Sequence, residues 1–247
     1  MNIPQLVERK FLFASRQPIT APLYEIVIAQ NGVFKRARRR EMQAVVELSA
    51  FAVKIPELAI EEARVELIEK IPCNIFAEIL AHARSETDAA NFTENLYAVC
   101  RNTEIGNYFW KEVSRSRSFG STIARDDDPA YQTAVLEIHT HPPGCRQFSA
   151  SDDCDERGKF RLFGILVDIH SDNPLIRLRV GIYDSFWEIP AEIITDAPLE
   201  NLTDLVKQER ERLALQICYS PGDDALEYIL AEEYRAATVN LSYVENL

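Results

Sequence analysis

The chain lacks several features that would assign it at once to a familiar class. Its five cysteines are odd in number, widely spread and without a Cys-x-x-Cys pair, so neither a disulfide framework nor a four-cysteine zinc site is indicated. No apolar stretch approaches the roughly 18 to 20 residues of a membrane-spanning helix. Glu8, Arg9 and Lys10 stand where a secretory signal needs its apolar segment, so we expect a cytoplasmic protein without membrane contact.

Positive charge is also scarce. The 27 Lys and Arg residues are outnumbered by 39 Asp and Glu residues, which gives a net charge of −12. Phosphates would be repelled by such a surface, so general affinity for nucleic acid is excluded. The exception is the basic run Lys35–Arg40, with five cationic residues in six positions. We interpret it as a solvated surface segment at a turn or at the end of an element, with a docking patch for an acidic protein surface as the alternative.

The first third of the chain predicts a small sheet followed by helices. Hydrophobic residues make up 47% of the 247 residues, enough for a large core. Residues 23–29 and 44–53 are rich in β-branched and apolar residues, with the turn signal Asn31-Gly32 between them, and predict antiparallel strands. The charged segment 57–70 after Pro56 predicts a helix. Pro72 predicts the start of a second helix, over 72–86, whose apolar stripe is Ile75, Phe76, Ile79, Leu80 and Ala83.

Strand patterns dominate the centre of the chain. The spacing of apolar residues predicts strands at 95–101, 108–113, 134–141, 162–169, 176–183 and 186–189. The polar segment that contains Gly120 and Asp126-Asp127-Asp128 predicts a surface loop. Residues 149–159 predict a short helix, and helical spacing returns at 200–216 and 223–238.

One segment, from Glu137 to Asp152, carries the chemistry. Side chains two apart on a strand point to the same face, so His139 and His141 can converge on one cation while Thr140 faces away. The sequence Pro-Pro-Gly then ends the strand. Ser149 is placed to cap the next helix, whose first turn contains Asp152.

The order of these features matters more than each feature alone. A His-x-His pair is often a surface pair, and Ser-x-x-Asp is most often a helix capping box. Together, a strand His-x-His, a Pro-Gly turn and a carboxylate at a helix start supply three nitrogen and oxygen ligands. They leave a fourth position for water, which is the arrangement of catalytic zinc.

At these residues the sequence resembles the JAMM/MPN+ (JAB-domain) zinc metallopeptidases, whose signature is an upstream Glu, then His-[Ser/Thr]-His-Pro, six residues and Ser-x-x-Asp. Here His139–Pro142 and Ser149–Asp152 meet that spacing, and the helix 72–86 is followed by a strand that starts near Glu94. The chain departs from the family at Leu136-Glu137-Ile138, where the bacterial branch reads Gly-Glu-Trp, and at Phe148, where a proline is common.

The resemblance spans about residues 72 to 190 and implies an α/β (α+β) fold, with a mixed β-sheet flanked by helices. We expect residues 71–195 to form the catalytic domain. Residues 1–70 would form a β-rich accessory region able to dock a substrate or protein partner, and residues 196–247 a helical appendage.

The resemblance also assigns roles. One zinc ion per chain would be held by His139, His141 and Asp152, Glu94 would act as general base, and Ser149 would donate a hydrogen bond to the oxyanion.

Several alternatives stay open on the residues alone. Glu137 shares strand parity with both histidines and could be the base or a ligand, and Cys145 could be a soft ligand. Asp153 and Asp155 are expected to face solvent. His82 and His170 are expected to be structural or surface residues.

The family's usual activity is hydrolysis of isopeptide or peptide bonds at the C-terminus of ubiquitin or a ubiquitin-like protein, either as deconjugation or as precursor processing. That is the expected function, with a ubiquitin-like protein as partner. The alternatives are release of a small product from a sulfur-carrier protein of ubiquitin-like fold, and a non-catalytic MPN interaction module.

Overall fold

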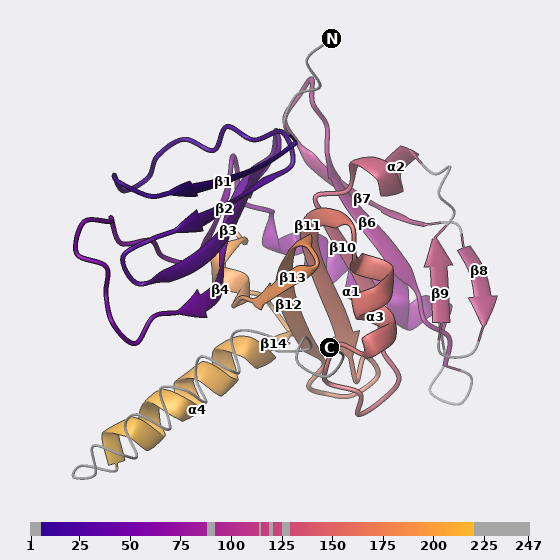
Figure 1. Ribbon diagram of the computed structural model, residues 1–247. Coiled ribbons are helices and arrows are strands. Elements are labelled where there is room, and N and C mark those ends of the chain that lie inside the picture. Colours follow the sequence, from indigo (N-terminus) through magenta and orange to yellow (C-terminus); the bar gives the residue numbers. More distant parts are fainter. Residues whose placement is uncertain (1–5, 88–91, 114, 119–120, 125–128, 220–247) are drawn as a thin grey trace.

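The computed structural model describes residues 6–87, 92–113, 115–118, 121–124 and 129–219. The fold is mixed α/β, as predicted, with one five-stranded and one seven-stranded mixed sheet (Figure 1). Among these residues no helix is both long and apolar enough to cross a bilayer.

The five-stranded sheet is built in chain order from the N-terminal residues. Its strands are β1 (Val7–Phe11), β2 (Tyr24–Ile28), β3 (Gly32–Arg38), β4 (Met42–Ala50) and β5 (Arg64–Leu67). β1 pairs with β2 in parallel, and the other pairs are antiparallel. The sequence prediction of a small sheet around the Asn31-Gly32 turn is confirmed.

The helix predicted over 57–70 is wrong, because β5 lies within that segment. Val65 is 7% exposed and pairs with Ala44 of β4. The alternation of Val65 and Leu67 with charged residues suits a half-buried strand. Backbone hydrogen bonds to the open edge of β4 thus outweigh the helical propensity of a charged segment.

The seven-stranded sheet contains the strands predicted between residues 95 and 189. Its order is β13 (Ser185–Glu188), β12 (Leu175–Tyr183), β11 (Lys159–Val167), β10 (Leu136–Thr140), β6 (Leu96–Arg101) and β7 (Tyr108–Glu112), with the short β14 (Thr203–Asp204) beside β12. Only β10 with β11, and β12 with β14, are parallel pairs in this sheet. The expected surface loop is wrong in part, since β8 (Arg115–Ser118) and β9 (Ser121–Ala124) pair as antiparallel strands there. Gly120 and Asp126-Asp127-Asp128 lie outside the described residues.

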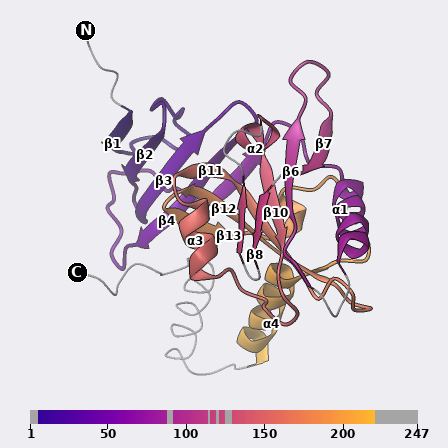
Figure 2. The same cartoon turned by 90° about the vertical axis from the view of Figure 1, so that its right-hand side faces the viewer.

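Helices cover both faces of the seven-stranded sheet. α1 (Cys73–Glu86) buries the predicted apolar stripe. α1 and the five-stranded sheet both contribute to the hydrophobic core on that face of the seven-stranded sheet to which Leu136 and Ile138 point. α3 (Ala150–Glu156) lies on the opposite face, and α2 (Pro129–Thr133) packs on β6 (Figures 1 and 2). The two sheets therefore pack on each other and share one core. The expected boundary between an accessory region and a catalytic domain near residue 70 stays a prediction.

A short 3-10 turn (Ala191–Ile193) leads to α4 (Leu205–Tyr219), which projects from the body (Figures 1 and 2). It corresponds to the helix predicted over 200–216. The helix predicted over 223–238 lies outside the described residues.

The basic run is partly buried and partly exposed, since Lys35 and Arg36 are buried and Arg39 is half-buried, whereas Arg38 and Arg40 are exposed. Arg36 is fully buried, and its guanidinium donates to Glu25 at 2.6 Å and to Glu61 at 3.1 Å. Lys35 is 3% exposed and bonds Asp184 at the end of β12. Arg36 is therefore part of the core of the sheet and Lys35 is part of its contact with the second sheet, so the solvated interpretation is wrong for these two residues. It holds for Arg38 and Arg40, which are exposed at and beyond the end of β3.

Arg39 has a structural role as well. Its guanidinium donates to the backbone carbonyls of Ala134 at 2.9 Å and Phe160 at 3.2 Å, and it pairs with Glu41. Lys35, Arg36 and Arg39 are thus engaged within the chain, and the docking alternative, which would rest on the exposed Arg38 and Arg40, stays a prediction.

Glu25 makes the stability of this sheet sensitive to acid. Burial by itself raises its pKa, but hydrogen bonds from Lys10, the Thr20 amide and Arg36 outweigh burial and lower the pKa from 4.5 to about 2. A lowered pKa contributes stability above pH 4.5 that is lost as the pH falls toward 2. Between pH 5 and 2, the native protein should lose about 3 kcal/mol more unfolding free energy than Glu25→Gln. Denaturant titrations across this range test it, with the exposed Glu57→Gln as control; parallel curves for the native protein and Glu25→Gln would contradict it.

Candidate metal centre

Three predicted ligands converge at the end of β10. The Nε2 atoms of His139 and His141 are 2.9 Å apart, and Asp152 places one carboxylate oxygen 3.1 Å from the first and the other 3.3 Å from the second. The ligand atoms of these residues all lie within 4.8 Å of one another. Both histidines are buried, so the group could hold a metal ion within the protein and not on an open surface.

The donor geometry fits a small tetrahedral cation. Ligand atoms about 2.0–2.2 Å from a tetrahedral zinc ion lie roughly 3.3–3.6 Å apart. The three observed separations need to widen by only a few tenths of an ångström. Two imidazole nitrogens and a carboxylate oxygen are also the donors of catalytic zinc sites with three protein ligands.

The capping box of α3 orients the carboxylate ligand. The Ser149 hydroxyl accepts the Asp152 amide at 3.2 Å, and Asp152 accepts the Ser149 amide at 2.6 Å. The same carboxylate faces both histidines. Burial alone would raise the pKa of Asp152, but the hydrogen bonds of His139 and His141 hold it well below its usual range. Capping and metal binding are therefore compatible roles of one residue.

The turn after β10 sets the orientation of His141. Its Nδ1 lies 3.0 Å from the Cys145 carbonyl, an acceptor, which leaves Nε2 as the atom that faces the other ligands. Gly144 takes a positive φ of 82° in this turn and donates its amide to Asp168 at 2.8 Å. The Cys145 side chain is exposed and is not part of the ligand group. Cys145 thus contributes to the site through its backbone carbonyl, which orients His141.

Glu94 lies beside the ligand group. The segment before β6 is tied to β10 because Thr140 donates its amide to the Asn95 carbonyl at 2.9 Å and its hydroxyl accepts the Asn95 amide at 2.8 Å. Burial lowers the pKa of His141, but Asp152, the Cys145 carbonyl and the charge of Glu94 raise it, and the net shift is upward. Thr140, which faces away from the histidines, thereby places the segment that carries the predicted base.

Glu137 has a different environment. It shares the face of His139, as strand parity predicts, but its carboxylate pairs with Arg161 at 3.2 Å and Lys159 at 3.5 Å. It is 6% exposed and is not part of the ligand group. These ion pairs give Glu137 a structural role, which favours Glu94 as the base.

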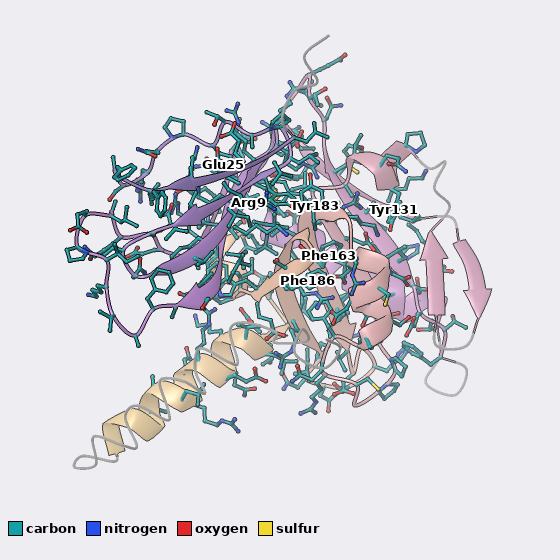
Figure 3. The ribbon with its side chains drawn as sticks, viewed as in Figure 1. Arg9, Glu25, Tyr131, Phe163, Tyr183 and Phe186 are labelled. Atoms are coloured by element: carbon teal, nitrogen blue, oxygen red, sulfur yellow. The ribbon has the colours of Figure 1, made fainter. Side chains whose placement is uncertain are left out.

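Two buried arginines of β12, Arg177 and Arg179, bond the elements that carry the site. Arg179 is fully buried and pairs with Asp153 and Glu156 of α3, each at 2.6 Å. Its guanidinium also lies 3.8 Å from the ring centre of Phe148 and 4.1 Å from that of Phe186, which Figure 3 shows beside Phe163. Arg179 therefore holds both the helix that carries Asp152 and the residue before its cap.

Arg177 fixes the turn itself. Its Nε donates to the Arg146 carbonyl at 2.8 Å, and its guanidinium pairs with Glu188 and with Glu209 of α4. Sequence reasoning missed both arginines, although charged residues at alternate positions of an apolar strand signal buried ion pairs. The expectation that Asp153 faces solvent is wrong for the same reason, whereas Asp155 is exposed.

The two remaining histidines lie outside the ligand group. His82 packs edge-on against Tyr97 and Trp110, with ring centres 5.7 and 5.2 Å away. His170 is exposed and lies 3.3 Å from the Thr87 hydroxyl. The structural or surface roles expected for them are confirmed.

Loss of Arg179 should weaken metal binding more than loss of an equally buried arginine elsewhere. Arg179→Met would leave Asp153 and Glu156 without their cation, so α3 should shift and zinc affinity should fall roughly 10- to 100-fold. Arg36→Met, which also removes a buried guanidinium paired with two carboxylates, should lower the melting temperature without changing the zinc affinity of the folded protein. Zinc titration against a chelating indicator measures both, and equal zinc affinity in Arg179→Met and the native protein would contradict the supporting role.

No model of a known protein family matches the chain, and no curated protein matches it in sequence. Membership of the JAMM/MPN+ family therefore rests on the motif and stays a proposal. What the structure shows is a mixed α/β fold with a His139, His141 and Asp152 group that could hold a metal ion.

Proposed function

We propose that this protein is a zinc-dependent hydrolase of the JAMM/MPN+ type that cleaves an amide bond. The observation that carries the proposal is the convergence of His139, His141 and Asp152, with ligand atoms within 4.8 Å of one another, beside Glu94. The three ligands are close together in the sequence, whereas Glu94 is distant from them. The pairing of β6 with β10 brings the segment of Glu94 to the end of β10. A purely structural zinc site would be closed by a fourth protein ligand, and the described residues supply three.

The roles proposed for the individual residues come from the resemblance, and the positions of the side chains are compatible with them. Bound zinc would supply a Lewis acid that lowers the pKa of water toward about 7 and polarises a carbonyl. Glu94 would take the proton of the attacking water and pass it to the leaving amine. The Ser149 hydroxyl accepts the Asp152 amide, which leaves its own hydrogen to stabilise the developing oxyanion.

The substrate class rests on the motif alone. Cleavage at the C-terminus of ubiquitin or a ubiquitin-like protein is the leading proposal, and release of a small product from a sulfur carrier of ubiquitin-like fold is the second. A non-catalytic interaction module would not require a carboxylate beside an incomplete ligand set, so the arrangement of Glu94 favours an enzyme.

The decisive experiment measures metal and activity on one preparation. The purified chain should contain one zinc ion and should cleave at least one of a panel of ubiquitin-like fusions, with cleavage located by mass spectrometry. A chelator should abolish cleavage and added zinc should restore it. Zinc binding without cleavage of any fusion would contradict the proposed substrate class, and absence of zinc binding would contradict the proposal as a whole.

A further inference from the structure

A small pocket lies directly beside the metal centre. It has a volume of about 160 Å³ and shares His141 with the ligand group. Phe92, Pro143 and Ile169 supply its apolar walls, and the loop after β11 completes it. Pockets for whole small molecules are usually about 300–1,000 Å³. A volume this small suits a single side chain of a larger substrate.

The polar residues around the pocket are already engaged by the protein. The Asp168 carboxylate accepts from the Gly144 amide and pairs with Arg146 at 3.2 Å. His170 contacts the Thr87 hydroxyl, and His141 directs Nδ1 to the Cys145 carbonyl.

The backbone of the loop is engaged as well. The carbonyls of Ile169 and Ser171 accept from the Arg84 guanidinium, at 2.5 and 3.1 Å, and the Ser171 hydroxyl accepts the Asn173 amide. A charged substrate group would have to displace these bonds to be satisfied. The pocket therefore favours an apolar side chain.

The position of Phe92 indicates which half of the substrate the pocket receives. Phe92 precedes Glu94 by two residues in the same segment before β6. A base that passes its proton to the leaving amine must lie on the side of the leaving group. The pocket belongs to that side, since it shares the Glu94 segment.

We propose that this pocket binds the apolar side chain of the residue that follows the scissile bond, so that the preferred substrates release a branched aliphatic residue or a chain that begins with one. The inference rests on the proposed hydrolase function. Complete burial of a leucine side chain corresponds to roughly 10- to 100-fold in affinity.

The test uses three peptides, acetyl-Gly-Gly-Xaa-amide with Xaa as Gly, Leu or Lys, titrated into full-length zinc-loaded Glu94→Gln, where no turnover interferes. The Leu peptide should bind about tenfold more tightly than the Gly peptide, whereas the Lys peptide should bind no more tightly than the Gly peptide. Adding Ser171→Phe, a change at the exposed rim of the pocket, should remove the preference for Leu and leave binding of the Gly peptide unchanged. The same change at the distant exposed Ser49 is the matched control.

A second variant covers the opposite direction. Phe92→Ala enlarges the pocket and should shift the preference toward a peptide with Xaa as Phe. No preference for Leu, or a preference that survives Ser171→Phe, would overturn the inference. If the preference follows the pocket variants but the zinc-loaded native protein cleaves none of the peptides or fusions, the pocket stands and the proposed hydrolase fails.

Discussion

Glu94→Gln should retain one zinc ion per chain and an unchanged melting temperature while losing roughly 10²-fold or more in kcat, the range usual for a general base. Glutamine keeps the shape of the side chain and removes its ability to take a proton. Glu94 is not among the grouped ligands, so the metal should not depend on its charge. Zinc content, thermal unfolding and kcat on one cleaved fusion are the three measurements.

Glu137→Gln is the matched control, since Glu137 is the other carboxylate upstream of the histidines that was considered as the base. Its charge balances Arg161 and Lys159, and Arg161 is 6% exposed. Removing that charge leaves a buried cation unpaired, which costs stability. Glu137→Gln should therefore melt earlier but keep most of its activity at low temperature. An active Glu94→Gln with an inactive, zinc-loaded Glu137→Gln would reverse the two assignments.

Asp152→Ala should lose nearly all bound zinc. The described ligand group has three members and no spare carboxylate or thiol, so two histidines alone should bind zinc too weakly to survive dialysis. His139→Ala and His141→Ala should behave alike. Metal analysis after dialysis against metal-free buffer measures the loss, and Asp155→Ala, an exposed residue of the same helix, should keep one zinc ion.

The capping role of Asp152 has to be separated from its role as a ligand. Ser149→Ala removes the acceptor of the Asp152 amide but leaves the carboxylate in place. It should cost about 1 kcal/mol of stability, as loss of a helix cap usually does, and keep its zinc. Zinc retained at full stoichiometry in Asp152→Ala would mean that another residue, Cys145 or Glu137 first, is the third ligand.

The local geometry of the site could be predicted because it depends on near neighbours in the chain. Strand parity places His139 and His141 on one face, and the spacing of Ser149 and Asp152 defines a helix cap. The stripe of α1 was likewise predictable, since its five apolar residues recur at helical spacing. In each case the interacting residues lie within a few positions of each other.

Predictions failed where a distant partner decides the conformation or the charge state. The segment 57–70 has helical composition, but β4 offers it an open edge and β5 forms. The basic run reads as a surface segment because the carboxylates that pair with Arg36 come from β2 and from the loop before β5. No local pattern could place those partners.

The amino-acid sequence by itself therefore determined the three candidate metal ligands and the elements that carry them. Only the tertiary structure distinguishes the surroundings of Glu94 and Glu137, since the charge of Glu94 acts on His141 whereas Glu137 has two cationic partners. It alone also showed that Arg177 of β12 bonds the turn after β10 and that Arg179 of β12 pairs with α3. The physical reason is that strand parity and helix caps are set within a few residues, whereas ion pairs between strands are set by sheet register across the fold.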